Sequence, residues 1–150
     1  MFKYSTKDFN AMLAALDTQH TNGVIELYTG AQPASPDDAA TGTLIGTATK
    51  DAGAFTPGTA TNGLNFAAPV LNAMSKEAAE TWKFTAVAAG TIGWGRLKGN
   101  GTDAGGSSTA LPRIDFTVGI TSGDARTSKV TYAIGEIGTV DSFTITQTNN

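Results

Sequence analysis

The chain has 150 residues, a length that suggests one domain, and only 15% of them are charged, compared with about 25% in a typical soluble protein. The net charge is −3 and no basic stripe stands out, so we expect no binding to nucleic acid. The absence of cysteine excludes a disulfide framework, cysteine-ligated zinc and thiol nucleophiles. The 24 threonines and 18 glycines favour strands and tight turns, and so an all-β fold.

Residues 5–20 are predicted to form the one helix of the chain. Ser5 or Thr6 can cap it, and Asp8 lies in the first turn, where the helix dipole favours an acid. Two interpretations of its apolar stripe stay open: the stripe covers an open end of the domain's own core, or it docks on a neighbouring subunit. Four residues at helical spacing make the stripe: Phe9, Met12, Leu13 and Leu16.

After the helix, apolar residues recur with a period of two, which predicts short strands. Polar residues at the alternate positions favour antiparallel pairing with one wet face. We therefore expect a jelly-roll-like antiparallel β-sandwich of about eight strands, in which residues 72–80 form a hairpin connection and residues 121–128 a turn. One domain would span 1–150, with a helical segment at 1–21 and the sandwich at 22–150. The expected strands lie within residues 23–29, 43–49, 64–70, 81–89, 91–99, 113–120, 129–138 and 139–148.

The glycines in "GTIGWGRLKGNG" raise the question of a phosphate site. Gly93, Gly95 and Gly99 match neither the dinucleotide fingerprint nor the phosphate-binding loop, and no clear helix start follows them. We interpret them as positions where a strand bends or where Trp82 or Trp94 packs against bare backbone. No cofactor is predicted.

The candidates for catalysis or metal binding are sparse. His20, the only histidine, is expected at the end of the helix, a position that favours a cation. Asp17 and Thr18 lie beside it without forming a recognisable triad. The acids are scattered, and "GTDAGGSS" offers one acid where a calcium loop needs several. No catalytic residue and no metal ligand is predicted.

Trp94 and Arg96 are expected on one side of a strand, and their pairing has two interpretations. In the first, the Arg96 stem packs along apolar surface and its head reaches water or a carboxylate. In the second, the two side chains form an interface patch, because both residue types are enriched at binding hot spots.

Three stretches resemble a known family: "NGVIELYTGAQPASPDDAATGTLIGT", "SKEAAETWKFTAVAAGTIGWGRLKG" and "GTVDSFTITQ". They are similar to the head decoration, or cement, proteins of tailed bacteriophages, which have a jelly-roll-like β-sandwich. The most specific pieces are residues 28–33 with 39–44, and Trp82 together with Gly90, Trp94 and Arg96. Gly95 departs from the pattern, since an aromatic residue is expected there, and the glycine-rich loop before residue 113 is longer than expected.

The resemblance implies a non-enzymatic virion protein that binds the outer surface of a capsid and stabilises the shell by bridging subunits of the major capsid protein. The implied partners are that protein and neighbouring copies of this chain, with no membrane. The start of the chain lacks the apolar core of a signal peptide, so we expect synthesis in the host cytoplasm. The loops at 31–42 and 99–110 are expected to add contacts. The predicted interface residues are Phe9, Leu13, Leu16, Trp94 and Arg96.

Two other functions stay open from the sequence. A tail- or fibre-associated binding module for a host surface glycan predicts a pocket with exposed aromatic rings beside carboxylates. A hydrolase on a β-scaffold predicts a concave cluster of acids, or a histidine with perturbed titration.

Overall fold

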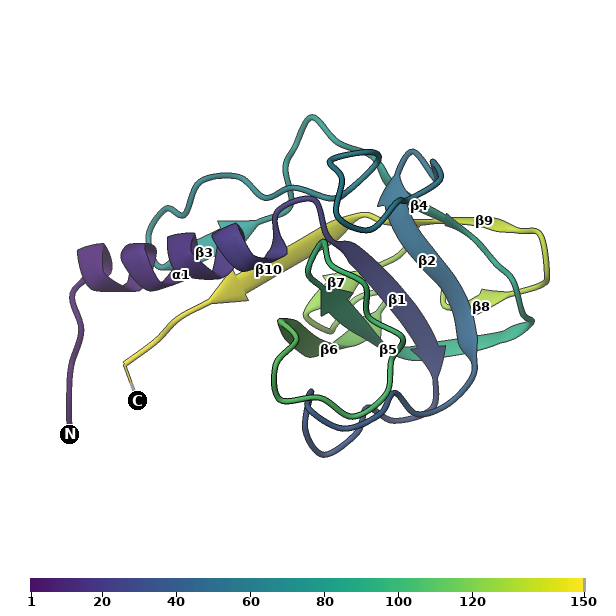
Figure 1. Cartoon of the computed structure of the whole chain (residues 1–150), viewed down its shortest axis with the longest axis horizontal. Coiled ribbons are helices and arrows are strands. Elements are labelled where there is room, and N and C mark those ends of the chain that lie inside the picture. The colour runs from purple at the N-terminus through teal and green to yellow at the C-terminus, as the bar shows by residue number, and fades with distance from the viewer. Residues whose placement is uncertain (150) are drawn as a thin grey trace.

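The computed structural model describes residues 1–149 and shows ten strands, nine of them in one path, with a single helix at the N-terminus (Figure 1). Neighbours along the path follow the order β3-β10-β7-β6-β5-β1-β2-β4-β9, and β8 pairs with the start of β5. The strands are β1 (Val24–Thr29), β2 (Leu44–Lys50), β3 (Ala73–Ser75), β4 (Trp82–Thr85), β5 (Gly90–Lys98), β6 (Arg113–Gly119), β7 (Ala125–Arg126), β8 (Thr131–Tyr132), β9 (Ile137–Val140) and β10 (Ser142–Thr146).

The sheet curls until its two ends meet. Strand β9 is the last strand at one end of the path, and β10 is the second strand from the other end. Only Asp141 separates β9 from β10 along the chain, so the two ends of the sheet lie together. The Asp141 N–H donates to the carbonyl of Arg126 in β7, which fixes this junction. The result is an all-β fold with a curled sheet, as the alternating sequence pattern predicts.

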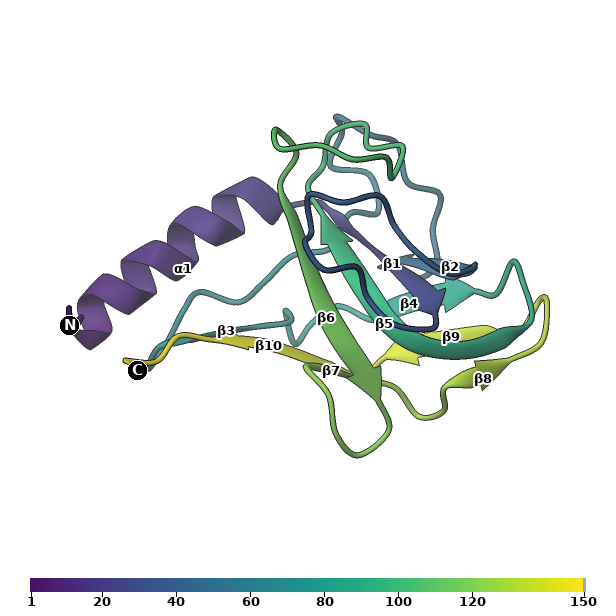
Figure 2. The same ribbon diagram turned by 90° about the horizontal axis from the view of Figure 1, so that it is seen from below.

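Helix α1 (Thr6–His20) begins at a complete capping box. The Ser5 hydroxyl accepts from the Asp8 N–H, and the Asp8 carboxylate accepts from the Ser5 N–H at 3.1 Å. The helix projects from the sheet above β3 and β10, and both chain ends lie at its far end (Figures 1 and 2). The helix is too short and too polar to span a bilayer, and the described residues contain no other.

The helix packs on the chain's own core. Leu13 is fully buried within it, Leu16 packs against it, and Phe9 is also buried. The interpretation that the stripe covers the domain's own core is therefore confirmed for Leu13 and Leu16. Met12 was expected in the same stripe but is 42% exposed, because it lies at the edge of the buried face.

Aromatic rings fill the centre of the curled sheet. Phe143 meets Phe116 with ring centroids 4.8 Å apart, and it also contacts Trp82 and Phe66. The Trp82 Nε1–H donates to Glu80, which also accepts from the backbone and side-chain N–H groups of Asn65. Burial acts to raise the pKa of Glu80, but these hydrogen bonds outweigh it and lower the pKa below its usual value.

Four predictions of local structure are wrong in detail. The strand expected at 129–138 is interrupted by a turn, so that β8 and β9 are separate strands. Residues 64–70 form only isolated bridges, at Leu64, Phe66 and Val70, because the segment carries Pro69 and lacks sustained alternation. Part of the expected hairpin connection at 72–80 forms β3, which pairs with β10. The expected turn at 121–128 contains β7, which pairs with β6 in parallel, so the sheet is mixed and not purely antiparallel.

The glycine-rich strand β5 does accept a packed ring on bare backbone, but the ring belongs to Phe116 and not to Trp82 or Trp94 as expected. A Cβ on Gly95 would lie 2.6 Å from the ring of Phe116, so any larger residue would displace that ring from the core.

Candidate functional site

The central strands β1, β5 and β6 carry charged side chains on the face that points away from the aromatic core. Five of these residues, together with Asp103 in the loop after β5, form what we call the ionic layer: Glu26, Arg96, Lys98, Asp103, Arg113 and Asp115. Three are acids and three are bases, so their formal charges sum to zero. Most are buried despite their charge.

Arg96 and Asp115 form the innermost pair. They face each other across β5 and β6, and the guanidinium donates to both carboxylate oxygens at 2.7 and 2.8 Å. Their side chains are 0% and 3% exposed. The hydrogen bonds to Asp115 raise the pKa of the Arg96 guanidinium above its usual value.

Lys98 joins β1 to the loop after β5. Its ammonium lies 2.6 Å from Glu26 Oε2 and donates to the Asp103 carbonyl at 3.0 Å. Arg113 donates to both oxygens of Asp103 at 2.7 and 2.5 Å. Burial acts to raise the pKa of Asp103, but the hydrogen bonds from Arg113 and the Gly105 N–H outweigh it and hold the pKa below its usual value.

Two aromatic rings complete this face. Tyr28 stacks on Trp94 with centroids 4.7 Å apart, and the Arg96 guanidinium lies 5.5 Å from the centroid of the Trp94 ring. The Tyr28 hydroxyl donates to Glu26 at 2.5 Å. Burial and this hydrogen bond raise the pKa of Tyr28 far above its usual range, so the hydroxyl remains a donor.

The loops at 31–42 and 99–110 cover the ionic layer. They are hydrogen-bonded to each other twice, from Ala40 to Gly105 and from Ser108 to Asp37. Arg96 donates to the Asp38 carbonyl at 3.0 Å, which joins the first loop to the layer. The loops therefore act as a lid of the chain's own, and the face that sequence alternation predicts to be wet is covered.

The predicted interface residues lie mostly inside the chain. Trp94 is 1% exposed and Arg96 is 0% exposed, so neither offers surface to a partner in this conformation. Of the two interpretations of Arg96, the first is confirmed: its guanidinium reaches a carboxylate, that of Asp115. Phe9 and Leu13 are buried, and Leu16 is partly buried under the helix.

His20 is also turned inward. Its Nδ1 lies 2.9 Å from the Leu16 carbonyl and must carry the proton to bond with it, while the buried Nε2 has no partner among residues 1–149. Burial lowers the pKa of His20 below 6.5, outweighing the helix carbonyl and Asp17. The expectation that this position favours a cation is therefore wrong, because desolvation exceeds the effect of the helix end.

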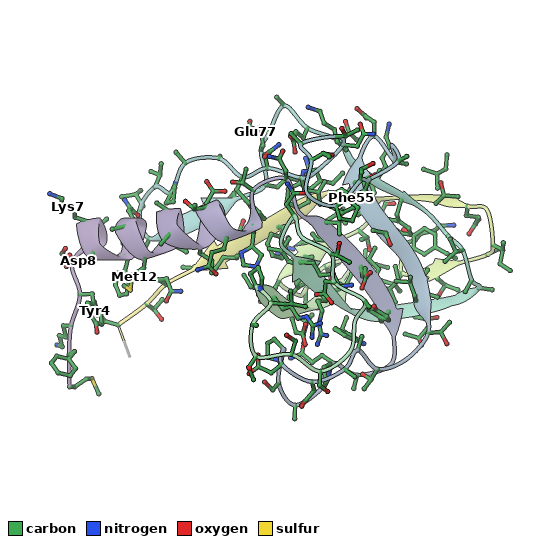
Figure 3. The ribbon with its side chains drawn as sticks, in the orientation of Figure 1. Tyr4, Lys7, Asp8, Met12, Phe55 and Glu77 are labelled. Carbon is green, nitrogen blue, oxygen red and sulfur yellow. The ribbon has the colours of Figure 1, made fainter. Side chains whose placement is uncertain are left out.

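A hollow of about 340 Å³ lies beside the ionic layer, between the loop at 51–63 and the segment after β5. Phe55 and Pro57 form one wall, and Glu26, Lys98 and Asp103 form polar parts of the lining. Residues Val24, Thr47, Gly99 and Gly101 complete it. Figure 3 shows Phe55 on the body of the molecule near β2, away from the free end of the helix.

Exposed apolar side chains gather at two ends of the molecule. At the free end of the helix lies a patch that we call the arm end, where Figure 3 places Tyr4 and Met12. The turn before β3 belongs to it, since the Asn72 N–H donates to Asn10 of the helix at 3.1 Å. The arm end consists of Met1, Phe2, Tyr4, Met12, Val70 and Leu71, each at least 42% exposed.

The opposite end of the molecule carries the second patch, which we call the hairpin end: Val87, Ile134 and Ile137. Two backbone hydrogen bonds, from Ala86 to Glu136 and from Gly135 to Ala86, hold these segments together. All three side chains are more than 60% exposed. Figures 1 and 2 show the β8–β9 connection at the end of the molecule away from α1.

Leu71 stands out within the arm end because of its backbone. It has φ of 50° and Asn72 has φ of 66°, as the tight turn between Val70 and Ala73 requires. Asparagine tolerates that region, but leucine is strained there by about 1–2 kcal/mol. The Leu71 side chain is 80% exposed, so only a small part of it packs on the rest of the chain.

No group of three or more histidine, aspartate or glutamate side chains within residues 1–149 is placed to hold a metal ion. Comparison of the chain with protein-family models, with curated proteins and with solved structures finds no match.

Proposed function

We propose that this protein is a non-enzymatic virion component that binds the outer surface of a phage capsid and bridges subunits of its major capsid protein. The observation that carries the proposal is the pair of exposed apolar patches at opposite ends of an elongated molecule. A bridging protein needs two separate contact surfaces, and these patches supply one at each end of the molecule.

The arm end is the better candidate for the capsid contact. Its strained, exposed Leu71 and the exposed Phe2 are residues of the kind that a partner would cover. The hairpin end then contacts a second capsid subunit or a neighbouring copy. Leu13 and Leu16 fix the helix that carries the arm end on the core, and the Phe9 ring contacts Tyr4 of the arm end.

The size of the molecule allows two such contacts. The chain exposes 7553 Å², and a standard interface takes about 800 Å² from each partner. Two interfaces would cover roughly a fifth of the surface. Once one end is attached, the other end is held near its own binding site at a high effective concentration. Binding at both ends then stabilises the assembled shell by mass action. We further propose that the curled sheet is a jelly-roll-like β-sandwich.

Co-sedimentation with expanded capsids of a tailed phage that carries this protein tests the proposal. We expect binding, and we expect Leu71→Ser combined with Phe2→Ser to weaken it at least about tenfold, since about 1.4 kcal/mol of lost contact gives that factor. Ile120→Ser is the matched control, because Ile120 is 52% exposed but lies outside both patches.

A single-ended variant separates bridging from simple attachment. Ile134→Ser with Ile137→Ser should leave the protein on the capsid but remove its protection of the shell against heat. Failure of the wild-type protein to bind the assembled shell would overturn the proposal, as would equal binding by the arm-end variant and the Ile120→Ser control.

A further inference from the structure

The hollow beside Phe55 is held in a fixed shape by the segments around it. The Gly58 N–H donates to the Asn100 carbonyl at 2.8 Å and joins the loop at 51–63 to the segment after β5. The Asn62 side chain donates to the Ala54 carbonyl at 2.8 Å and braces the loop from within. A preformed hollow spares a ligand the cost of ordering its own site.

The lining has two chemically different sides. Phe55 and Pro57 offer an apolar wall, and Phe55 is only partly buried, so part of its ring is open to a ligand. On the other side, Glu26 accepts from Tyr28 and pairs with Lys98 through its Oε2 atom. Its Oε1 atom makes no hydrogen bond within residues 1–149 and is available to a ligand hydroxyl. Thr47 adds a further hydroxyl to the lining.

The charges around the hollow select against an ionic ligand. Lys98 lies 2.6 Å from Glu26, and Asp103 is paired with Arg113, so each charge already has a counter-ion. A phosphate or carboxylate would have to displace Glu26 from Lys98. An amine would compete with Lys98 for the same carboxylate. A neutral ligand meets neither cost.

We propose that this hollow binds a neutral saccharide, stacked on Phe55 by the C–H face of its ring and hydrogen-bonded through its hydroxyls to Glu26 Oε1 and Thr47. Sugar rings combine an apolar face with polar edges, as the lining does. The volume of about 340 Å³ is at the lower end of the range of about 300–1,000 Å³ for small-molecule sites, which suits one or two rings. The site goes beyond the capsid role and does not depend on it.

The test is titration of the isotope-labelled protein with neutral sugars, followed by amide chemical shifts. The probes are glucose, galactose, mannose, N-acetylglucosamine, lactose and maltose, with inorganic phosphate, N-acetylneuraminic acid and glucosamine as charged comparisons. We expect at least one neutral sugar to shift the amides of Phe55, Gly99 and Gly101 in a saturable way, and we expect the charged probes to leave them unshifted.

Variants decide whether the hollow is the site. Phe55→Ala should weaken sugar binding at least about tenfold, and Phe2→Ala, which removes the same side chain at the arm end, should not change it. Thr47→Val keeps the shape of the side chain and should weaken binding less. Phe55→Ala should also bind capsids as the wild type does, which separates this site from the proposed bridging.

Two results would overturn the saccharide site. One is the absence of any saturable shift with the neutral sugars. The other is binding that survives Phe55→Ala, or that favours phosphate or another charged probe over every neutral sugar.

Discussion

The two faces of the central strands β1, β5 and β6 are both buried, but they are stabilised in different ways. One face is apolar, with Leu27, Leu97 and Phe116 in the aromatic core. The other carries the ionic layer beneath two loops. Apolar contacts are non-directional and depend little on pH, whereas buried ions need every partner in place. The hydrogen bonds of Arg96 to Asp38 and of Arg113 to Asp103 tie the two loops to the charges beneath them.

Removal of one partner from the ionic face should have the largest effect. Asp115→Ala leaves the Arg96 guanidinium buried without its counter-ion, and we expect a loss of about 3–5 kcal/mol in the free energy of unfolding. Urea denaturation measures it. The double variant Arg96→Met with Asp115→Leu removes both charges and should recover most of the loss. A cost below about 1 kcal/mol for Asp115→Ala would show that water reaches the pair.

A cavity on the apolar face should cost somewhat less on average. Leu27→Ala removes a fully buried side chain of β1 and is expected to lower the free energy of unfolding by about 2–5 kcal/mol. The loss should be the same at neutral and mildly acidic pH, because no charge changes. A loss that varied strongly with pH would contradict the separation of the two faces.

Acid should distinguish the faces further. The pKa of Asp103 is lower in the folded chain than its ordinary value of 3.8, so its contribution to stability is present above that pH and is lost as the pH falls through the folded value. Thermal unfolding at decreasing pH should therefore show a shallower acid loss for Asp103→Asn than for the wild type. Part of the acid-dependent loss of stability should remain in Asp103→Asn, because the pKa of Glu80 is also lowered in the folded chain. Leu27→Ala should retain the full wild-type slope, and equal slopes for all three proteins would refute the assignment.

An exposed ion pair should show the smallest effect. Lys83 and Asp51 lie 3.4 Å apart with side chains 37% and 62% exposed. We expect Lys83→Gln to change the free energy of unfolding by less than about 1 kcal/mol and to lose even that effect in concentrated salt. A change as large as that of Asp115→Ala would mean that burial does not set the strength of these pairs.

Local chemistry explains which parts of the fold could be predicted. The Ser5 cap and the stripe containing Leu13 predict the helix, and alternation around Phe116 predicts β6. The strand β7 has no such signal, because its pairing with β6 and β10 comes from tertiary packing. Alternation correctly places Trp94 and Arg96 on one side of β5, but nothing local shows that distant loops close over that side.

The candidate sites were predictable only in part. The sequence indicates the two loops as features of interest, but their mutual hydrogen bonds, from Ala40 to Gly105 for example, link residues far apart along the chain. The hollow beside Phe55 gives no sequence signal at all, since its lining comes from four separate segments. The exposed Leu71 gives none either, because its unusual backbone follows from the turn it occupies.

The single residue between β9 and β10 has a consequence for how the molecule comes apart. Because Asp141 joins strands that belong to opposite flanks of the sheet, neither flank can peel away without pulling on the other. Unfolding should therefore be highly cooperative, with hydrogen exchange in β4 and β10 governed by the same global opening. One residue inserted at 141 would loosen this closure and let the flanks open separately.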